Sequence, residues 1–127
     1  MNSDVPSLEA CQRLVKAGLI PLDESGNILW WVELPPDSPF LTRCPASERL
    51  DSGVYTYAPT LGEMLAEIRR RGWLGKVRYE PVAQLCDATV GCGPPDVRRR
   101  HYEAQHKEAA DALANALHEA MEKEGKA

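Results

Sequence analysis

The stretch TYAPTLGEMLAEIRRRGW, residues 56–73, is predicted to contain the end of a strand, a complete helix and the residues that end this helix. Pro59 disfavours helical backbone in the residue before it, so the helix begins after this proline. Thr60 is placed as its N-cap, and Glu63, three residues later, completes a capping box. Gly72 ends the helix as a left-handed C′ residue. The apolar side chains between these signals follow the spacing of one buried helix face: Leu61, Met64, Leu65 and Ile68.

This helix ends in three consecutive cations, Arg69, Arg70 and Arg71. Cations in a last turn offset the partial negative charge of the helix end by about 0.3–1 kcal/mol each. Consecutive side chains also point about 100° apart around the axis, so one helix face cannot aim all three at a phosphate backbone. We therefore interpret the cluster as helix-end stabilisation. The alternative is a nucleic-acid contact shared with a second cluster, Arg98, Arg99 and Arg100.

Signals of the same kind predict two further helices. In the first, Ser7 is the N-cap and Gly18 the C′ residue, which places Leu19 to fold back on Leu14 in a Schellman cap. The second is predicted over about residues 97–124, because apolar side chains and i, i+4 charge pairs recur along it. Its second half is the more apolar, so the first half is free to extend beyond the core or to meet a partner.

Alternating apolar residues predict strands at Ile28–Leu34, Val54–Tyr57 and Lys76–Glu80, with a further apolar piece at Val82–Cys86. In the first strand, Trp30 lies on the inward face and Trp31 on the opposite one. Prolines predict a long loop over residues 35–53, and glycines with a Pro-Pro pair predict a second loop over 88–96. The elements together predict a single α+β domain, residues 1–127, in which an antiparallel sheet of three or four strands packs against helices in the order α-β-β-α-β-α.

The composition fits a soluble globular protein, with 43% apolar and 27% charged residues among 127. The net charge of −4 argues against non-specific binding to nucleic acid or to an anionic membrane. The N-terminal residues lack the basic and apolar regions of an export signal, and no run approaches the length of a membrane span. We expect a cytoplasmic protein.

The cysteines are Cys11, Cys44, Cys86 and Cys92, and in the cytoplasm we expect them to stay reduced. Cys86 and Cys92 could join His101 or His106 in a metal site, but their spacing is wider than that of common structural zinc sites. We therefore predict no metal and no other cofactor. The same residues leave a small Cys/His enzyme as the least favoured reading, since no local signature identifies a nucleophile and base pair.

The most specific surface signal is a predicted pair on the polar side of the sheet, Trp31 and Arg78. A solvent-facing tryptophan beside an arginine is typical of a binding hot spot or a cation–π pair. The alternative is that the long loop or the last helix covers Trp31.

Two pieces of sequence, CQRLVKAGL at 11–19 and APTLGEML at 58–65, carry a resemblance. With the tryptophan-rich strand between them and the C-terminal helix after them, they resemble small uncharacterised proteins encoded in bacteriophages and prophages. The resemblance covers most of the chain and implies no activity and no functional residue. We expect a non-enzymatic accessory or protein-interaction protein of prophage type, whose partner is another protein or a second copy. The alternative is a nucleic-acid-associated regulator using the arginine clusters.

Overall fold

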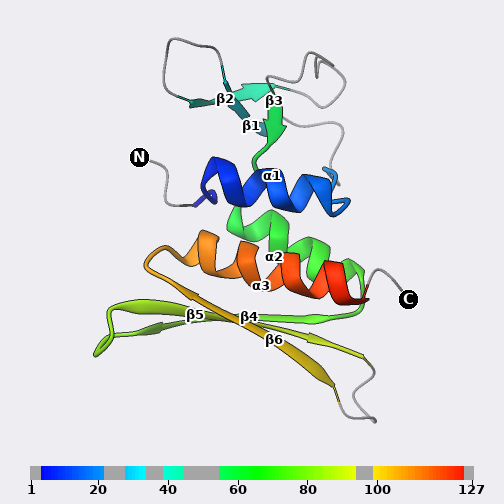
Figure 1. Ribbon diagram of the computed structural model, residues 1–127, viewed down its shortest axis with the longest axis vertical. Helices are drawn as coiled ribbons and strands as arrows, with labels where there is room; N and C mark the ends of the chain where they lie inside the picture. Colours follow the sequence, from blue (N-terminus) through cyan, green and yellow to red (C-terminus); the bar gives the residue numbers. More distant parts are fainter. Residues whose placement is uncertain (1–3, 22–27, 34–38, 45–54, 94–98, 125–127) are drawn as a thin grey trace.

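The computed structural model describes residues 4–21, 28–33, 39–44, 55–93 and 99–124 (Figure 1). Within these ranges the chain forms three helices and two three-stranded antiparallel sheets, which confirms the α+β class. In chain order the elements are α1 (Leu8–Lys16), β1 (Ile28–Val32), β2 (Phe40–Cys44), β3 (Tyr55–Tyr57), α2 (Leu61–Arg70), β4 (Leu74–Glu80), β5 (Leu85–Cys92), β6 (Arg100–His106) and α3 (Ala109–Glu124).

The elements stack in layers, with one sheet at each end and the helices between them (Figure 1). The sheet of order β2-β1-β3 lies beside α1, and the sheet of order β4-β5-β6 is covered on one face by α3. The α2 helix contacts both α3 and β4. The single sheet expected from the sequence is therefore wrong, because the chain between α1 and α2 builds one sheet and the chain between α2 and α3 builds another.

The α1 and α3 helices run in the same direction. The Ser7 backbone N–H, at the start of α1, donates to Asp111 Oδ1 near the start of α3 at 2.8 Å. One turn further along α3, Asn115 Oδ1 accepts from Arg13 Nη2 at 2.9 Å. Figure 1 shows α2 running the same way, so the carboxyl ends of all three helices lie at one end of the helical layer.

Both predicted helix caps of α1 are confirmed. The Ser7 side chain accepts from the Ala10 N–H, and Gly18 has a φ of 109°. The Leu19 N–H donates to the Leu14 carbonyl at 3.0 Å, the outer hydrogen bond of a Schellman cap.

The α2 helix has the predicted capping box. The Glu63 N–H donates to Thr60 Oγ1 at 3.1 Å, and the Thr60 N–H donates to Glu63 Oε1 at 2.9 Å. At the other end Gly72 has a φ of 78°, and the Trp73 N–H donates to the Ile68 carbonyl at 3.0 Å. These local signals fix where α2 ends and where β4 begins.

One hydrophobic core joins α1, β1, β3, α2, β5 and α3. Trp30 lies at its β1 side, only 1% exposed, with its ring centroid 6.0 Å from that of Tyr57. Other large side chains that are fully buried in this core are Leu14, Met64, Ile68, Val90, Leu113 and Leu117. A second, smaller cluster on the other side of β1 consists of Val5, Cys11, Leu29 and Ala58, with Trp31 and Leu41 packed against it.

The predicted third helix is wrong over its first half. Residues 100–106 form β6, which pairs with β5, and the helix begins only at Ala109. Tyr102 and Ala104 are half-buried, whereas the residues next to them in the strand are exposed. This period of two belongs to a strand, and pairing with β5 outweighs the helix propensity of the Glu, Ala and Gln in the segment.

Two predicted loops also contain strands. Residues 88–92 belong to β5, the central strand of its sheet, and residues 40–44 form β2. Gly91 favours a loop in the sequence but lies inside β5. Of the two glycines in this segment, Gly91 and Gly93, only Gly93 has a positive φ. Residues 94–96 and the rest of the 35–53 segment apart from 39–44 lie outside the described ranges.

The remaining strand predictions are confirmed at β1, β3 and β4, with β4 beginning two residues earlier than expected. Leu34 and Val54, at the ends of the predicted strands, lie outside the described ranges. The apolar piece predicted at 82–86 is divided, because Val82 lies in the turn before β5 and is 98% exposed.

Candidate functional site

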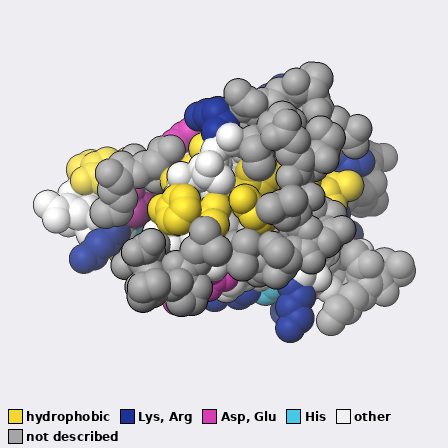
Figure 2. All heavy atoms as spheres, turned by 90° about the horizontal axis from the view of Figure 1, so that it is seen from above, with side chains coloured by type: hydrophobic (Ala, Val, Ile, Leu, Met, Phe, Trp, Pro, Cys, Tyr) yellow, Lys and Arg dark blue, Asp and Glu magenta, His cyan; other side chains and the backbone are white. Residues whose placement is uncertain are grey.

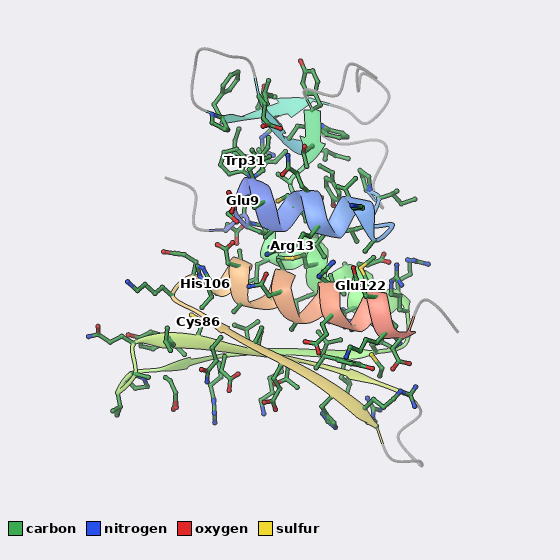
Figure 3. All side chains as sticks on the ribbon, in the orientation of Figure 1. Glu9, Arg13, Trp31, Cys86, His106 and Glu122 are labelled. Atoms are coloured by element: carbon green, nitrogen blue, oxygen red, sulfur yellow. The ribbon has the colours of Figure 1, made fainter. Side chains whose placement is uncertain are left out.

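A groove of about 610 Å³ lies where α1, α2 and α3 come together toward their carboxyl ends. Arg13 on α1 and Glu122 on α3 can be located in Figure 3. The side chains that line the groove are those of Arg13, Lys16, Ala17, Arg71, His118, Met121 and Glu122. A cavity of this volume lies within the range of small-ligand and side-chain-binding sites in proteins.

Cations outnumber carboxylates around this groove. Arg13 has its hydrogen bond with the neutral amide of Asn115, and neither Arg13 nor Lys16 forms an ion pair with another described residue. His118 Nε2 lies 3.0 Å from Glu122 Oε1 and is only partly exposed. The Arg13 guanidinium and the Lys16 ammonium, both on α1, are therefore available to an acceptor that enters the groove.

Part of this positive charge has a structural role. Arg13 and Lys16 lie in the last turn of α1, where cations offset the partial negative charge of a helix end. Because the three helices run the same way, three such ends lie close to the groove. A ligand carboxylate would therefore bind chiefly through hydrogen bonds from Arg13 and Lys16, since the helix ends reduce the long-range field.

Glu67 binds two of the three arginines at the end of α2. It is only 3% exposed, and its carboxylate accepts from Arg70 Nε at 2.9 Å, from Arg70 Nη2 at 2.8 Å and from Arg71 Nε. Burial raises the pKa of Glu67, but the hydrogen bonds and charges of both arginines outweigh burial and leave the pKa lowered. Arg71 also stacks on Trp73, with its guanidinium 5.3 Å from the ring centroid.

Arg100 from the second arginine cluster is likewise paired. Its Nε and Nη2 donate to the two carboxylate oxygens of Glu124, and the Tyr102 hydroxyl donates to the same carboxylate at 2.6 Å. Hydrogen bonds from Arg100 and then from Tyr102 lower the pKa of Glu124 to about 2. These contacts fasten the end of α3 to β6.

The structure does not gather the arginine clusters into one surface. Arg70, Arg71 and Arg100 are held by carboxylates, which leaves Arg69 and Arg99 as cluster members without an acidic partner among the described residues. Arg69 is exposed at the end of α2, and Arg99 lies on the outer face of the β4-β5-β6 sheet. Arg98 lies outside the described ranges.

Trp31 and Arg78 do not share a face, so this structural expectation is wrong. Trp31 lies in β1 and its Nε1–H donates to the Pro6 carbonyl at 3.0 Å, which places it under the segment before α1. Leu41, in the part of the predicted loop that forms β2, pairs with Trp31, and residues 35–38 and 45–53 of that loop lie outside the described ranges. Arg78 lies in β4 of the other sheet, with its side chain 61% exposed and 3.6 Å from Asp87.

The strand pairing brings one cysteine and one histidine together. Cys86 on β5 lies directly opposite His106 on β6 (Figure 3). The Cys86 thiol donates to the Lys107 carbonyl, at 3.8 Å, and His106 Nδ1 accepts from the Glu108 N–H at 3.0 Å. These contacts direct the Cys86 thiol and His106 Nδ1 toward the backbone instead of toward each other.

The other two residues of the candidate metal set are kept apart. Cys92 is fully buried and lies on the helix-facing side of β5, whereas His101 lies on the outer face of β6. Among the described residues, no group of three or more His, Cys, Asp or Glu side chains is arranged to hold a metal ion.

Sequence reasoning missed the groove itself. Arg13, Arg71 and His118 come from three helices and are far apart in the chain, so no local spacing connects them. The only available signal was the basic last turn of α1, which has a sufficient local explanation as a helix end.

Comparison with family models, with curated proteins and with solved structures found no match to this chain. No helix in the described part of the chain is long and apolar enough to cross a membrane.

Proposed function

We propose that this protein is a prophage-type accessory protein that works by binding a partner protein, and that the groove between α1 and α3 receives an acidic segment of that partner. One observation carries the proposal: in a protein of net charge −4, Arg13 and Lys16 line a groove and neither forms an ion pair with any residue that the structure describes. The resemblance to small phage and prophage proteins supports the accessory role.

The chemistry of the groove supports an acidic protein segment as its occupant. Arg13 offers a planar guanidinium that matches a carboxylate, and Lys16 adds a flexible ammonium one turn later. Met121 supplies an adaptable apolar floor that would contact the methylene groups of an Asp or Glu side chain. Glu122 in the groove lining would repel a continuous row of phosphates, which favours a peptide with spaced carboxylates over nucleic acid.

A fluorescein-labelled octapeptide of glutamate tests this proposal by fluorescence anisotropy. We expect saturable binding that weakens as salt rises, because exposed charge pairs are screened. An octapeptide of glutamine and a single-stranded oligothymidine serve as the neutral and nucleic-acid probes.

The variants reverse positive charges on different surfaces, two in the groove and one on the outer sheet face. Arg13→Glu with Lys16→Glu should weaken binding of the glutamate peptide by about tenfold, as expected when two charge attractions become repulsions. Arg78→Glu reverses an arginine on the outer sheet face and should leave binding unchanged.

Three outcomes would overturn the proposal. Equal losses in the groove variant and in Arg78→Glu would mean that net charge, and not the groove, drives binding. Tighter binding of oligothymidine than of the glutamate peptide would favour the nucleic-acid regulator. A stable homodimer whose interface covers Lys16 and Ala17 would assign the groove to self-association. Light scattering on the natural chain and on the groove variant would detect such a dimer.

A further inference from the structure

The outer face of the β4-β5-β6 sheet has a hollow of about 320 Å³. Its floor lies over Gly91, which has Leu74 opposite it on β4 and His101 opposite it on β6. A methyl group at Gly91 would lie 3.7 Å from the His101 ring and 3.8 Å from Arg99 Cδ. The missing side chain of Gly91 therefore makes the space that these two residues border.

A second row of side chains completes the lining. Lys76 on β4 and Glu103 on β6 lie on either side of Thr89 on the central strand, two residues along from the Gly91 row. Residues two apart in a strand share a face, so both rows point away from α3. The hollow thus has two cations, a histidine, a hydroxyl and one carboxylate within one concave surface.

Arg99 gives the strongest indication that this hollow takes a ligand. Its Nη1 atom is buried and makes no hydrogen bond with any described residue. The neighbouring Arg100 pairs with Glu124 on the helix side, so Arg99 lies on the opposite side of the chain, together with His101. A buried guanidinium nitrogen without an acceptor is unfavourable, and an anion in the hollow would satisfy it.

We propose that this hollow binds the phosphate group of a small organic phosphate. Arg99 and Lys76 supply the charged donors, with the Thr89 hydroxyl and the His101 ring as further hydrogen-bonding groups. Leu74, 61% exposed at the edge of the hollow, contacts the organic part of the ligand. Glu103 accepts from a ligand hydroxyl.

A single phosphate fits this surface better than a nucleic-acid strand. Among the described residues that line the hollow there is no Phe, Tyr or Trp on which a base could stack. Asp87 and Glu103 lie on the same outer face and would repel the phosphates that follow along a strand.

The test is an NMR titration of the ¹⁵N-labelled full chain with inorganic phosphate, ribose 5-phosphate and single-stranded oligothymidine in turn. We expect both small phosphates to shift the backbone amide signals of Thr89, Gly91 and His101, with tighter binding of ribose 5-phosphate because its sugar contacts Leu74 and Glu103.

Two variants and a control make the test specific. Arg99→Gln should weaken ribose 5-phosphate binding by about tenfold, since it removes a charge-assisted hydrogen bond. Gly91→Ala keeps every charge, reaches only ordinary contact distances, and should weaken binding by less than Arg99→Gln. Arg78→Gln removes a charge elsewhere on the same face and should leave binding unchanged.

Absence of localised shifts, or equal losses in Arg99→Gln and Arg78→Gln, would overturn the proposal. Equal affinities for inorganic phosphate and ribose 5-phosphate would overturn the assignment to an organic phosphate. Tighter binding of oligothymidine, with shifts spread over β4, β5 and β6, would replace the small ligand with a nucleic acid.

Discussion

The two sheets of this protein use their faces differently. In β2-β1-β3, both faces of the central strand are covered, because Trp30 lies in the main core while Leu29 and Trp31 join the second cluster. In β4-β5-β6, α3 covers one face and the other carries charged and polar residues. Figure 2 looks onto the β2-β1-β3 end of the molecule and shows apolar side chains near the middle of that face.

This difference indicates how structure and binding are divided within the chain. A strand with apolar residues on both faces adds stability but leaves no polar surface to a ligand. The outer face of β4-β5-β6 contributes little to the core, so its residues are free to bind. Arg78, Thr89 and Glu103 on that face can be changed at small cost in stability, whereas residues of β1 cannot.

The largest expected effect comes from the two neighbouring tryptophans of β1. Trp30→Ala should lower the free energy of unfolding by about 3–5 kcal/mol, because it leaves a cavity in the main core. Trp31→Ala removes a hydrogen bond and partial packing, and should cost about 1–2 kcal/mol. Urea denaturation followed by circular dichroism measures both. Equal costs would contradict the division of β1 into a main-core face and a minor-cluster face.

The next effect concerns the buried carboxylate beneath the arginines of α2. Glu67→Gln should lower the free energy of unfolding by about 2 kcal/mol, because the charge-assisted bonds from Arg70 and Arg71 are lost. Glu119→Gln is the matched control on α3, where the exposed carboxylate lies 4.0 Å from Lys123 and its loss should cost less than about 0.5 kcal/mol. If both variants unfold at the same urea concentration, Glu67 does not anchor the end of α2.

The sequence predicts those parts of the fold whose causes are local. Ser7, Gly18 and the Thr60–Glu63 capping box mark helix ends through contacts within a few residues, and all three predictions are confirmed. The sequence predicts residues 100–106 as helix from apolar spacing and i, i+4 charge pairs, and only pairing with β5 makes them a strand.

The candidate sites are less predictable because distant segments form them. Glu67 reads as an ordinary helix residue in the sequence, and its burial depends on packing that no local pattern shows. The hollow over Gly91 requires the register of three strands, which the sequence does not predict because its patterns assign residues 88–92 of β5 to a loop and residues 100–106 to a helix.

A smaller effect is the pH dependence of stability that arises from Glu124 at the end of α3. Glu124 has a pKa of about 2 in the folded protein, below its ordinary value of 4.5. The unfolded chain therefore binds this proton first as pH falls, so the stabilisation is complete above about pH 4.5 and is lost between there and pH 2. Urea denaturation across this range should show a shallower loss for Glu124→Gln than for the natural chain. Identical pH profiles would contradict the Arg100–Glu124 contact.

The last and smallest expected effect is on the reactivity of the cysteine thiols. Burial raises the pKa of Cys11 to about 12 and that of Cys92 to about 11, so both should resist alkylation in the folded protein at neutral pH. In a Cys44→Ser background, iodoacetamide labelling followed by peptide mass spectrometry should modify Cys86 first, since it is the most exposed of the three. Labelling of Cys92 before Cys86 would contradict the packing of β5 against α3.

Whether the helix groove binds an acidic segment is tested most directly by an NMR map of where the glutamate octapeptide binds on the ¹⁵N-labelled chain. We expect shifts of the Lys16, Ala17 and Met121 amide signals, with the Thr89 and Gly91 signals on the outer sheet face unmoved. Shifts confined to the outer face of β4-β5-β6, or no shifts at a peptide excess, would contradict the assignment of the helix groove as the site for an acidic partner.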